Sequence, residues 1–570
     1  MQGQFQDQFI EITTIIEKGE YEKLSSASLD VPDKFNWVGD VFEPLIVQAQ
    51  DDRNMLELVT DDPSETETIT YRQGLEKCNQ LLLFFTKHGV QQGDRVFIMC
   101  GLNKGLWISY LSAIKGGLVL IPAASILSAD DIVYRFQKAL PKVIITDQEN
   151  AEKMEQALSQ YHHPVKLKLV LDVERNGWIP FTAIDAEEKQ ASSADTKKDD
   201  DLFWFFTSGT TGMPKVVVHT QASYPLGHLT TVAWIGLKAG DKHYNISQPG
   251  WAKFAWSCVF APLNLGATVF VYLSKERFVA GKQLKLIEDN HITTLCAPPT
   301  ALRLMIQENL KSHRFSLREC VSAGEPLNAE VIKIWKDGTG LELRDGYGQT
   351  ESTCMICNLP GKKIKFGSMG SPAFLYDSII ADPDGHELPV HETGQIAVRI
   401  RPGSFNGIFK SYIGDAKTQG EVFKHGLYYT GDKAYKDADG YYWFVGRDDD
   451  VIKSSDYRIG SFEIESVLLE LDEVLESAVV GSPHPIRSQE VKAFIVLTSG
   501  VTATEELANK IFHYCKGHVA PYKIPRIIEF VTELPKTISG KIRRVELRAA
   551  EELRKAMKEK REHEYFSTKR

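Results

Sequence analysis

The sequence has no uncharged apolar run of the length that a membrane span requires. A transmembrane helix needs about 20 mostly apolar residues, and the longest candidate, residues 116–127, is shorter and contains Pro122. The N-terminus, MQGQFQDQFIEI, also lacks the basic segment followed by an apolar segment that begins a secretory signal peptide. We therefore expect a cytoplasmic protein without a membrane span.

Cysteine is scarce, with eight in 570 residues, and most of the eight lie inside apolar stretches. This distribution is typical of reduced, buried thiols and argues against a disulfide framework. Cys354 and Cys357 form a CxxC pair, but no further ligands at zinc-site spacing are evident. We predict a packing role for this pair, with a metal or redox role as the less favoured alternative.

The chain also lacks a basic excess, since its formal net charge is −10. Proteins that bind nucleic acid usually carry a basic face or stripe, so we expect no nucleic-acid partner. Small anionic ligands are not excluded, because local charges and backbone amides bind them. Its 43% hydrophobic and 25% charged residues are typical of a globular protein. Its 570 residues are enough for two to four domains.

Strand and helix patterns alternate along the first half of the chain. Helical spacing at 79–87 and 106–114 alternates with short apolar runs at 95–100 and 118–122, and a helix–strand–helix pattern follows at 275–310. Such alternation predicts an α/β fold, with a largely parallel sheet covered by helices.

The pattern changes after Gly367 to short strands between turns, which predicts a β-rich subdomain. The charged turn GRDDD at 446–450 is the best candidate boundary, and an α+β pattern follows it. We predict a large N-terminal domain of mixed α/β subdomains plus the β-rich subdomain, residues 1–446, and a small mobile α+β C-terminal domain, residues 447–570. The tail, 549–570, is rich in Glu, Lys and Arg and is expected to form an exposed helix.

A candidate phosphate-binding loop follows the apolar run LFWFF at 202–206, which is expected to be a buried strand. The loop, TSGTTGMPK, combines glycines that can expose consecutive amide N–H groups with four hydroxyls and one lysine. It is not a Walker A loop, because Val216 follows the lysine where that motif has Ser or Thr. The candidate phosphate ligands are Thr207, Ser208, Gly209, Thr210, Thr211, Gly212 and Lys215.

This segment, with the polar, charged loop at 186–201 and the strand before it, resembles the signature of the adenylate-forming superfamily. That superfamily includes acyl-CoA synthetases, luciferases and peptide-synthetase adenylation domains. Three further segments occur in the family's order, so that the resemblance covers nearly the whole chain: DGYGQTE at 345–351, YTGD at 429–432 with GRDDD at 446–450, and PKTISGK at 535–541. The resemblance implies that ATP activates a carboxylic acid as an acyl-adenylate.

The DGYGQTE segment has the chemistry of an adenine site. The ring of Tyr347 between two glycines can stack on adenine, Thr350 can bond a phosphate or carboxylate oxygen, and Glu351 can bind Mg²⁺. The resemblance implies the same roles and makes the stretch SAGEP at 322–326 a wall of the adenine pocket. The remaining implied nucleotide residues in these two segments are Gly324, Glu325, Pro326, Asp345, Gly346, Gly348 and Gln349.

The resemblance also assigns the ribose site and the moving parts. A carboxylate can accept hydrogen bonds from two ribose hydroxyls, and a nearby arginine adds donors. These roles would belong to Asp432 and Arg447, with Arg458 also at the nucleotide and Asp449 as the hinge. Lys541 would place its ammonium between the carboxylate and the α-phosphate, which repel each other.

After rotation of the C-terminal domain, a different face would line the thiol channel. The implied channel residues are Ser455, Asp456, Tyr457 and Gly460. The family commonly has glycine where this chain has Asp456, which can narrow or charge the channel and puts the thiol step, but not adenylation, in question.

The acid is expected to be longer or bulkier than acetate. Acetyl-specific relatives carry a tryptophan where this chain has Gly348, so we predict a deeper acyl tunnel, in which each buried methylene adds about 0.8 kcal/mol. The stretch QPGWAK at 248–253 resembles medium-chain acyl-CoA synthetases and implies that Trp251 lines the acyl pocket. A plain core tryptophan is the alternative. Medium-chain, branched and aromatic acids all fit.

We therefore predict an AMP-forming acyl-CoA synthetase that uses ATP, Mg²⁺ and coenzyme A. One alternative is an enzyme that loads the acyl group onto a separate carrier protein. Another is a non-catalytic nucleotide sensor, which the presence of Lys215, Glu351 and Lys541 argues against. A homo-oligomer is left open, and enzymes that acylate and deacylate Lys541 are candidate partners, because acylation would remove its charge.

Overall fold

The structure is a computed structural model. It describes residues 2–50, 52–207, 214–274, 276–401, 405–447, 450–454, 457–536, 541–557, 559 and 561–567. Within these ranges the strands form four sheets. No helix among the described residues is long and apolar enough to cross a membrane.

The two large sheets each have a parallel centre, as the alternating pattern predicts. In spatial order the eight-stranded sheet contains β19 (Ser411–Tyr412), β9 (Lys215–Thr220), β8 (Asp201–Thr207), β4 (Val119–Pro122), β3 (Arg95–Met99), β5 (Val143–Thr146), β6 (Leu167–Val170) and β7 (Ile179–Pro180). The nine-stranded sheet contains β16 (Ser371–Pro372), β15 (Cys354–Cys357), β14 (Leu343–Gly348), β13 (Glu319–Ala323), β12 (Thr294–Cys296), β10 (Lys242–Asn245), β11 (Thr268–Tyr272), β1 (Asn54–Val59) and β2 (Glu67–Thr70). Every residue of β4 and of β5 is buried, as expected for strands covered on both faces.

Two smaller sheets follow in the chain. The third contains β17 (Ser378–Ala381), β18 (Gly394–Arg399), β21 (Leu427–Lys436) and β20 (Phe423–Lys424), with β22 (Tyr442–Arg447) paired to β21. The fourth contains β24 (Tyr457–Ile459), β23 (Ile452–Ser454), β26 (Ser488–Leu497), β27 (Ile527–Phe530) and β28 (Glu564–Phe566), with β25 (Val474–His484) paired to β26. The third sheet confirms the predicted β-rich region after Gly367. The division of the chain at 446/447 stays a prediction.

Helices cover these sheets. Their bounds are α1 (Gln2–Lys18), η1 (Tyr21–Ser26), η2 (Val38–Val47), α2 (Gln48–Gln50), η3 (Pro63–Glu65), α3 (Tyr71–Lys87), α4 (Lys104–Lys115), α5 (Ala129–Ala139), α6 (Gln148–Ser159), η4 (Phe181–Ala186), α7 (Ser223–Gly227), α8 (Leu229–Ile235), α9 (Ala252–Phe254), η5 (Ala255–Phe260), α10 (Ala261–Leu263), α11 (Ala280–Asp289), α12 (Pro299–Met305), η6 (Leu310–Ser312), α13 (Ala329–Thr339), α14 (Ala416–Val422), α15 (Ser461–Leu468), α16 (Glu505–His518) and α17 (Arg544–Met557). Helix α3 begins before the predicted residue 79, because Thr70 and Gln73 form a reciprocal capping box at its N-terminus.

Packing between helices joins the two large sheets. Helix α3 packs on α4, α4 contacts β4 of the eight-stranded sheet, and α3 contacts β1 of the nine-stranded sheet. The largest core cluster continues through these helices. All eight cysteines lie in the described part of the chain, where they are buried and unpaired. Cys354 and Cys357 are buried in β15, in agreement with the predicted packing role.

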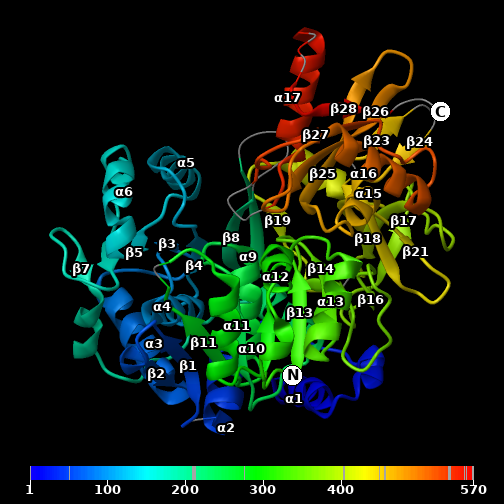
Figure 1. Cartoon of the computed structure of the whole chain (residues 1–570). Coiled ribbons are helices and arrows are strands. Elements are labelled where there is room, and N and C mark those ends of the chain that lie inside the picture. The colour runs from blue at the N-terminus through cyan, green and yellow to red at the C-terminus, as the bar shows by residue number, and fades with distance from the viewer. Residues whose placement is uncertain are drawn as a thin grey trace.

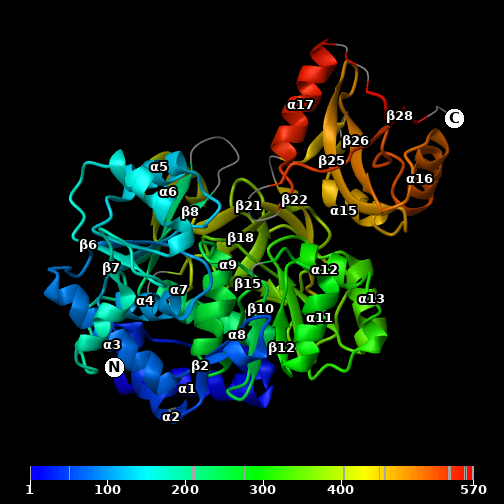
Figure 2. The same cartoon turned by 60° about the vertical axis from the view of Figure 1, so that its left-hand side comes forward.

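The C-terminal residues, drawn orange to red, form a lobe on the green and yellow part of the chain (Figures 1 and 2). Helix α15 contacts β22, and Asn328 Nδ2 donates to the carbonyl of Ser466 at 3.1 Å. The ring of Phe444 meets that of Phe462 edge to face, with centroids 6.0 Å apart. The lobe therefore lies directly on the third sheet and on α13.

The prediction of an exposed helical tail is only partly right. Helix α17 covers part of the tail, but β28 then adds a strand to the fourth sheet, paired antiparallel with β27. Two charged side chains of α17, Glu551 and Arg554, are buried. Charge in the sequence suggested a solvated face, but the partners of these charges come from distant strands.

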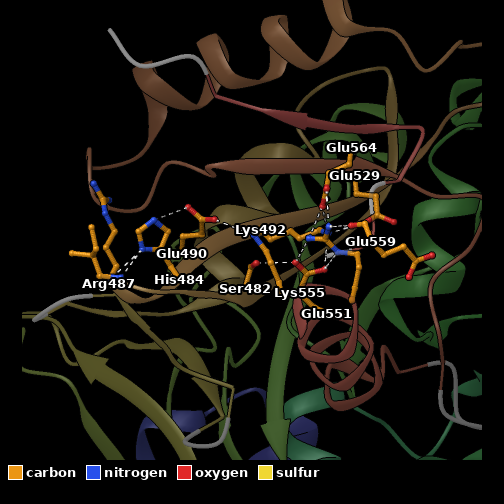
Figure 3. Close-up of polar contacts among 12 residues, drawn as sticks. Ser482, His484, Arg487, Glu490, Lys492, Glu529, Glu551, Lys555, Glu559 and Glu564 are labelled. Atoms are coloured by element: carbon orange, nitrogen blue, oxygen red, sulfur yellow. Dashed lines mark hydrogen bonds and ion pairs between the residues drawn. The ribbon is translucent and has the colours of Figure 1, made fainter. Parts of the chain in front are cut away.

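The partners are joined in a buried ionic cluster around Lys492 of β26 (Figure 3). Its ammonium lies 2.6 Å from Glu529, 2.7 Å from Glu551 and 2.6 Å from Glu564. Arg554 lies between two of these carboxylates, 2.9 Å from Glu551 and 3.0 Å from Glu564. The three carboxylates are close enough to hold a metal ion, but the ammonium already lies among them. The cluster therefore ties α17 and β28 to the centre of the fourth sheet without a metal.

We expect this cluster to make the lobe sensitive to acid. Burial alone would raise the pKa of Glu551, but hydrogen bonds from Arg554 and Lys492 outweigh it and lower the pKa to about 2. A carboxyl with a lowered pKa stabilises the fold fully above its unfolded pKa of roughly 4.3 and loses that contribution as the pH falls toward the folded value. The thermal unfolding midpoint of the full chain should therefore decrease as the pH is lowered from about 4.5 to the lowest pH that the protein tolerates. Glu551→Gln should be less stable at neutral pH and less pH-dependent in this window; equal slopes for both proteins would contradict the assignment.

Candidate functional site

The candidate nucleotide site lies at the carboxyl ends of β13 and β14. These strands are parallel neighbours, with Ala323 opposite Gly346. The predicted wall, Gly324 to Pro326, follows β13, and Tyr347 lies near the end of β14. Gly324 has a φ of +104°, in the left-handed region that favours glycine. Ligands in open α/β sheets bind outside the carboxyl ends of the strands, which is where the structure brings these two segments together.

Two residues of the DGYGQTE segment converge on Asp432 of β21. The hydroxyl of Tyr347 donates to Asp432 Oδ2 at 2.6 Å, and Gln349 Nε2 donates to the same oxygen at 2.6 Å. The hydroxyl of Tyr428 in turn donates to Gln349 Oε1 at 2.8 Å. The predicted adenine and ribose residues therefore form one hydrogen-bonded group, although about 85 positions of sequence separate them.

Asp432 is a buried carboxyl whose negative charge is only partly compensated by its neighbours. Its backbone pairs in register with Arg447 of β22. Burial raises its pKa, although the charge of Arg447 and the hydrogen bonds from Tyr347 and Gln349 oppose the rise. Further hydrogen bonds from hydroxyl groups would stabilise the charged carboxylate, and a ribose provides two such hydroxyls.

The hairpin that carries the phosphate loop lies against Thr350 and Glu351. Lys215 Nζ lies 5.6 Å from the ring centroid of Tyr412, whose hydroxyl donates to Glu351 Oε1 at 2.8 Å. Four residues further along β9, His219 Nε2 is 2.7 Å from the carbonyl oxygen of Thr350. Strand β9, which follows the phosphate loop in the chain, therefore lies beside the DGYGQTE segment.

The two ends of the loop are held together, because Thr207 at the end of β8 pairs with Lys215 at the start of β9. The other predicted phosphate ligands lie outside the described residues: Ser208, Gly209, Thr210, Thr211 and Gly212.

Glu351 could hold a divalent cation. Burial raises its pKa, and Tyr412 is the main hydrogen-bond donor that opposes the rise. A hard oxygen ligand with so little positive compensation fits Mg²⁺ chemically.

Two lysines bring positive charge to the same region. Lys253 of α9 donates to the carbonyl of Ala323 at 2.8 Å, and burial lowers its pKa. Lys541 is exposed, yet its charge lowers the pKa of both Lys253 and Asp432. Lys541 thus lies close enough to Lys253 and Asp432 for its charge to act on both, and its role in adenylation stays a prediction. Lys253 had no assigned role, although the QPGWAK stretch that contains it was singled out.

Asp345 and Gly346 support the site from behind. The carboxyl of Asp345 is buried and accepts from the amide of Gly346 at 2.9 Å, and burial raises its pKa well above the usual range. A Cβ atom at Gly346 would lie 2.5 Å from the ring of Trp234. These contacts hold the end of β14, and with it Tyr347, in place.

The predicted deeper tunnel at Gly348 is not what the structure shows. A Cβ atom there would lie 2.1 Å from the carbonyl oxygen of Thr353 and 2.3 Å from the ring of Trp256. The space that a side chain would need is therefore filled. Trp251, the predicted pocket residue, is partly exposed and precedes α9. Trp256 was not foreseen, because only the fold brings η5 against β14.

The predicted thiol-channel face is described only in part. Tyr457 is 52% exposed and its ring stacks on Tyr522 with centroids 4.3 Å apart. A Cβ atom at Gly460 would lie 2.3 Å from the carbonyl oxygen of Val445, so this glycine allows close approach to β22. The backbone of Arg458 pairs with Lys453. Asp449, Ser455 and Asp456 lie outside the described residues.

Comparisons with known proteins match two family models and several relatives to this chain. A family model described as "AMP-binding enzyme" matches residues 47–412, and one described as "AMP-binding enzyme C-terminal domain" matches 463–541. The chain is 46% identical over 534 residues to 4-hydroxybutyrate--CoA ligase 1 of Metallosphaera sedula, which covers 93% of each protein. It is 42% identical over 470 residues to the mitochondrial acyl-coenzyme A synthetase ACSM3 of Mus musculus, covering 81% of this chain and 80% of that protein.

A solved structure shares the fold. The anthranilate CoA ligase AuaEII, in complex with anthranoyl-AMP, aligns with a TM-score of 0.84 and 30% identity, covering 93% of this chain and 99% of that one. A benzoate CoA ligase from Burkholderia xenovorans LB400 aligns with a TM-score of 0.79 and 26% identity, covering 90% and 100%.

Proposed function

The chain belongs to the AMP-binding enzyme family, and from that premise we propose that it joins a carboxylic acid to coenzyme A through an acyl-adenylate. Pyrophosphate leaves in the first half-reaction and AMP in the second. The observation that carries the proposal is the convergence of Tyr347 and Gln349 on Asp432, opposite Arg447, with the charge of Lys541 reaching the same carboxylate.

Adenylation requires two anions to meet. The oxygen of the acid attacks the α-phosphorus of ATP, the bond to the pyrophosphate oxygen breaks, and the leaving electrons go to pyrophosphate. Lys541 would offset the repulsion between the carboxylate and the phosphate and hold them in line. Lys253 supplies a second positive charge at the same edge of the sheet.

The nucleotide would be held in parts by the segments that converge here. Adenine would stack on Tyr347, beside the wall of Gly324, Glu325 and Pro326, and the ribose hydroxyls would bond Asp432. The phosphates would lie in the loop at 207–215, with Thr350 beside them. Glu351 would hold Mg²⁺, which would neutralise charge on ATP.

The thiol step would use the face of the C-terminal lobe at 455–460, after rotation about Asp449. Tyr457 is exposed enough to meet a pantetheine arm. Cytoplasmic location and inhibition by acylation of Lys541 remain part of this proposal.

The class of acid that the chain would use is proposed from the names of its relatives. The relatives named above act on 4-hydroxybutyrate, anthranilate or benzoate, or are called acyl-CoA synthetases. The proposed substrates are therefore short to medium aliphatic acids, with or without a polar end, and aromatic acids.

The proposal is tested by acid-dependent release of pyrophosphate over acids from acetate to decanoate, with hydroxylated and aromatic acids included. Formation of AMP and acyl-CoA should follow when CoA is added. No pyrophosphate release with any acid would overturn adenylation. Thioester on a holo-carrier protein but not on CoA would show that the acceptor is a carrier.

We expect Asp432→Asn to weaken ATP use about 10- to 100-fold, chiefly as a higher KM for ATP. Loss of the negative charge weakens charge-assisted hydrogen bonds to the ribose, which are worth about 1.5–3 kcal/mol each. Initial rates of pyrophosphate release at varied ATP measure the change. Asp439→Asn, at a residue paired with Lys365 on the surface of the same subdomain, serves as the control and should leave KM near its original value. An unchanged KM in Asp432→Asn would remove Asp432 from the ribose site.

A further inference from the structure

Asn328 joins the predicted wall of the nucleotide site to the C-terminal lobe. It follows the stretch at 322–326 by two positions and caps the N-terminus of α13, where its Oδ1 accepts from the amide of Glu330 at 2.7 Å. Its Nδ2 donates to the carbonyl of Ser466, in the last turn of α15, at 3.1 Å. The side chain is buried, with 3% exposed. The two ends of one amide group therefore bond two different parts of the molecule.

The surfaces around this bond do not pack continuously. A cavity of about 220 Å³ lies beside Asn328, between α12 and α13 on one side and the lobe on the other. Val331 of α13 and Leu471 of the lobe are among the residues that line it. Packing alone therefore does not fix the orientation of α15 at this point, and the hydrogen bond supplies a directional contact.

Helix α15 is in turn fixed to the segment that carries Lys541. Glu465, the neighbour of Ser466, is buried, and its Oε1 accepts from the amide of Val479 in β25 at 2.7 Å. Arg544 Nη2 donates to the other carboxylate oxygen of Glu465 at 2.7 Å. Arg544 begins α17 and follows Lys541 by three residues. A shift of α15 is therefore passed to Lys541 through a charge-assisted hydrogen bond and three residues of chain.

We infer that Asn328 is a positioning residue for adenylation, because its hydrogen bond to Ser466 holds the lobe in the orientation that presents Lys541 for that step. This inference rests on the proposed function, in which Lys541 acts in the first half-reaction and the lobe rotates before the second. The bond joins the two parts that would move apart in this rotation, so it would be present in the first half-reaction and broken in the second. Asn328 acts through Lys541 and not on the reacting atoms.

Asn328→Asp tests the inference with a side chain of the same shape. Aspartate caps a helix as well as asparagine does, but its second oxygen cannot donate to the carbonyl of Ser466. We expect kcat for acid-dependent pyrophosphate release to fall about five- to tenfold, with KM for ATP little changed, because the orientation that the bond favours is less populated. Transfer of a supplied acyl-AMP to CoA should be unchanged or faster, since that step does not use the bond. Both half-reactions are measured with the full chain.

Two further variants separate the hydrogen bond from other effects. Asn328→Ser keeps a good capping residue and adds no charge, but its shorter side chain no longer bonds Ser466, so it should show the same selective loss. Asn103→Asp is the matched control, because Asn103 caps α4 and makes only short-range bonds, accepting from Leu106 at 3.2 Å and donating to Gly101 at 3.2 Å. It should leave both half-reactions near their original rates. The same selective loss in Asn103→Asp would show that the effect does not come from the bond to the lobe.

Three results for the Asn328 variants would overturn the inference: unchanged pyrophosphate release, equal loss of both half-reactions, or a higher KM for ATP as the main effect. The last would mean that Asn328 shapes the adenine wall instead. If Asn328→Asp does not fold, as judged by its thermal unfolding, Asn328→Ser decides; if neither folds, Asn328 is a structural residue and the inference is wrong. If the unmodified protein releases no pyrophosphate with any acid, it is the proposed function that fails.

Discussion

Lys541→Ala is expected to lower acid-dependent pyrophosphate release by about 100-fold or more, because one preorganised charge that stabilises a transition state contributes roughly 10²–10³ in rate. The structure supports this expectation, since the charge of Lys541 acts on both Asp432 and Lys253 although it lies in the C-terminal lobe. The same variant should still transfer a supplied acyl-AMP to CoA, because that step does not need the attack on phosphorus. Pyrophosphate release and thioester formation from acyl-AMP are measured separately.

Lys536→Ala is the matched control for this prediction. Lys536 lies five positions before Lys541 in the sequence and pairs with Glu476 at 2.7 Å, with 36% of its side chain exposed. Partly exposed pairs contribute little, about 0–1 kcal/mol, so both half-reactions should continue. A Lys541→Ala protein that lost both half-reactions equally would show that Lys541 is not specific to adenylation.

The second large effect is on stability, where Lys492→Met should destabilise the C-terminal lobe by about 3–5 kcal/mol. The methionine removes the ammonium that lies among Glu529, Glu551 and Glu564, and it leaves buried negative charge that the arginines only partly balance. The measurement is urea-dependent hydrogen exchange of the full chain, followed in peptides from β26, β28 and α17. Protection there should be lost at lower urea, while protection in the two large sheets should change little.

Lys510→Met provides the control, because Lys510 pairs with Glu473 on the surface of the same lobe and 56% of its side chain is exposed. Its substitution should shift stability by less than about 1 kcal/mol. Equal shifts for Lys492→Met and Lys510→Met would mean that the buried cluster does not hold the lobe together.

Much of the nucleotide site could be predicted because its segments are short and local. The TSGTTGMPK loop and the DGYGQTE segment each contain, within a few positions, the glycines, hydroxyls and charges that their chemistry needs. Their encounter through Lys215, Tyr412 and Glu351 could not be read from spacing. It was expected only because the family resemblance implied it.

The errors arose where a residue's effect depends on distant neighbours. Gly348 suggested open space, because the absence of a side chain is visible in the sequence. The structure fills that space with Trp256, which comes from a helix about 90 positions earlier. The charged tail suggested a solvated helix, because its charges are visible in the sequence and their partner is not. That partner, Lys492, belongs to a strand that precedes α17 by about 50 residues.

The sequence by itself determined the α/β class, the order of the motifs and the membership of an adenylate-forming family, since these depend on periodicity and on short runs of residues. Only the tertiary structure decided which residues meet: Asp432 with Tyr347, Trp256 with Gly348, and Lys492 with three glutamates. The physical reason is that burial and contacts with distant residues determine both the pKa of a charged group and the shape of a pocket. Neither is a property of one residue or its neighbours in the chain.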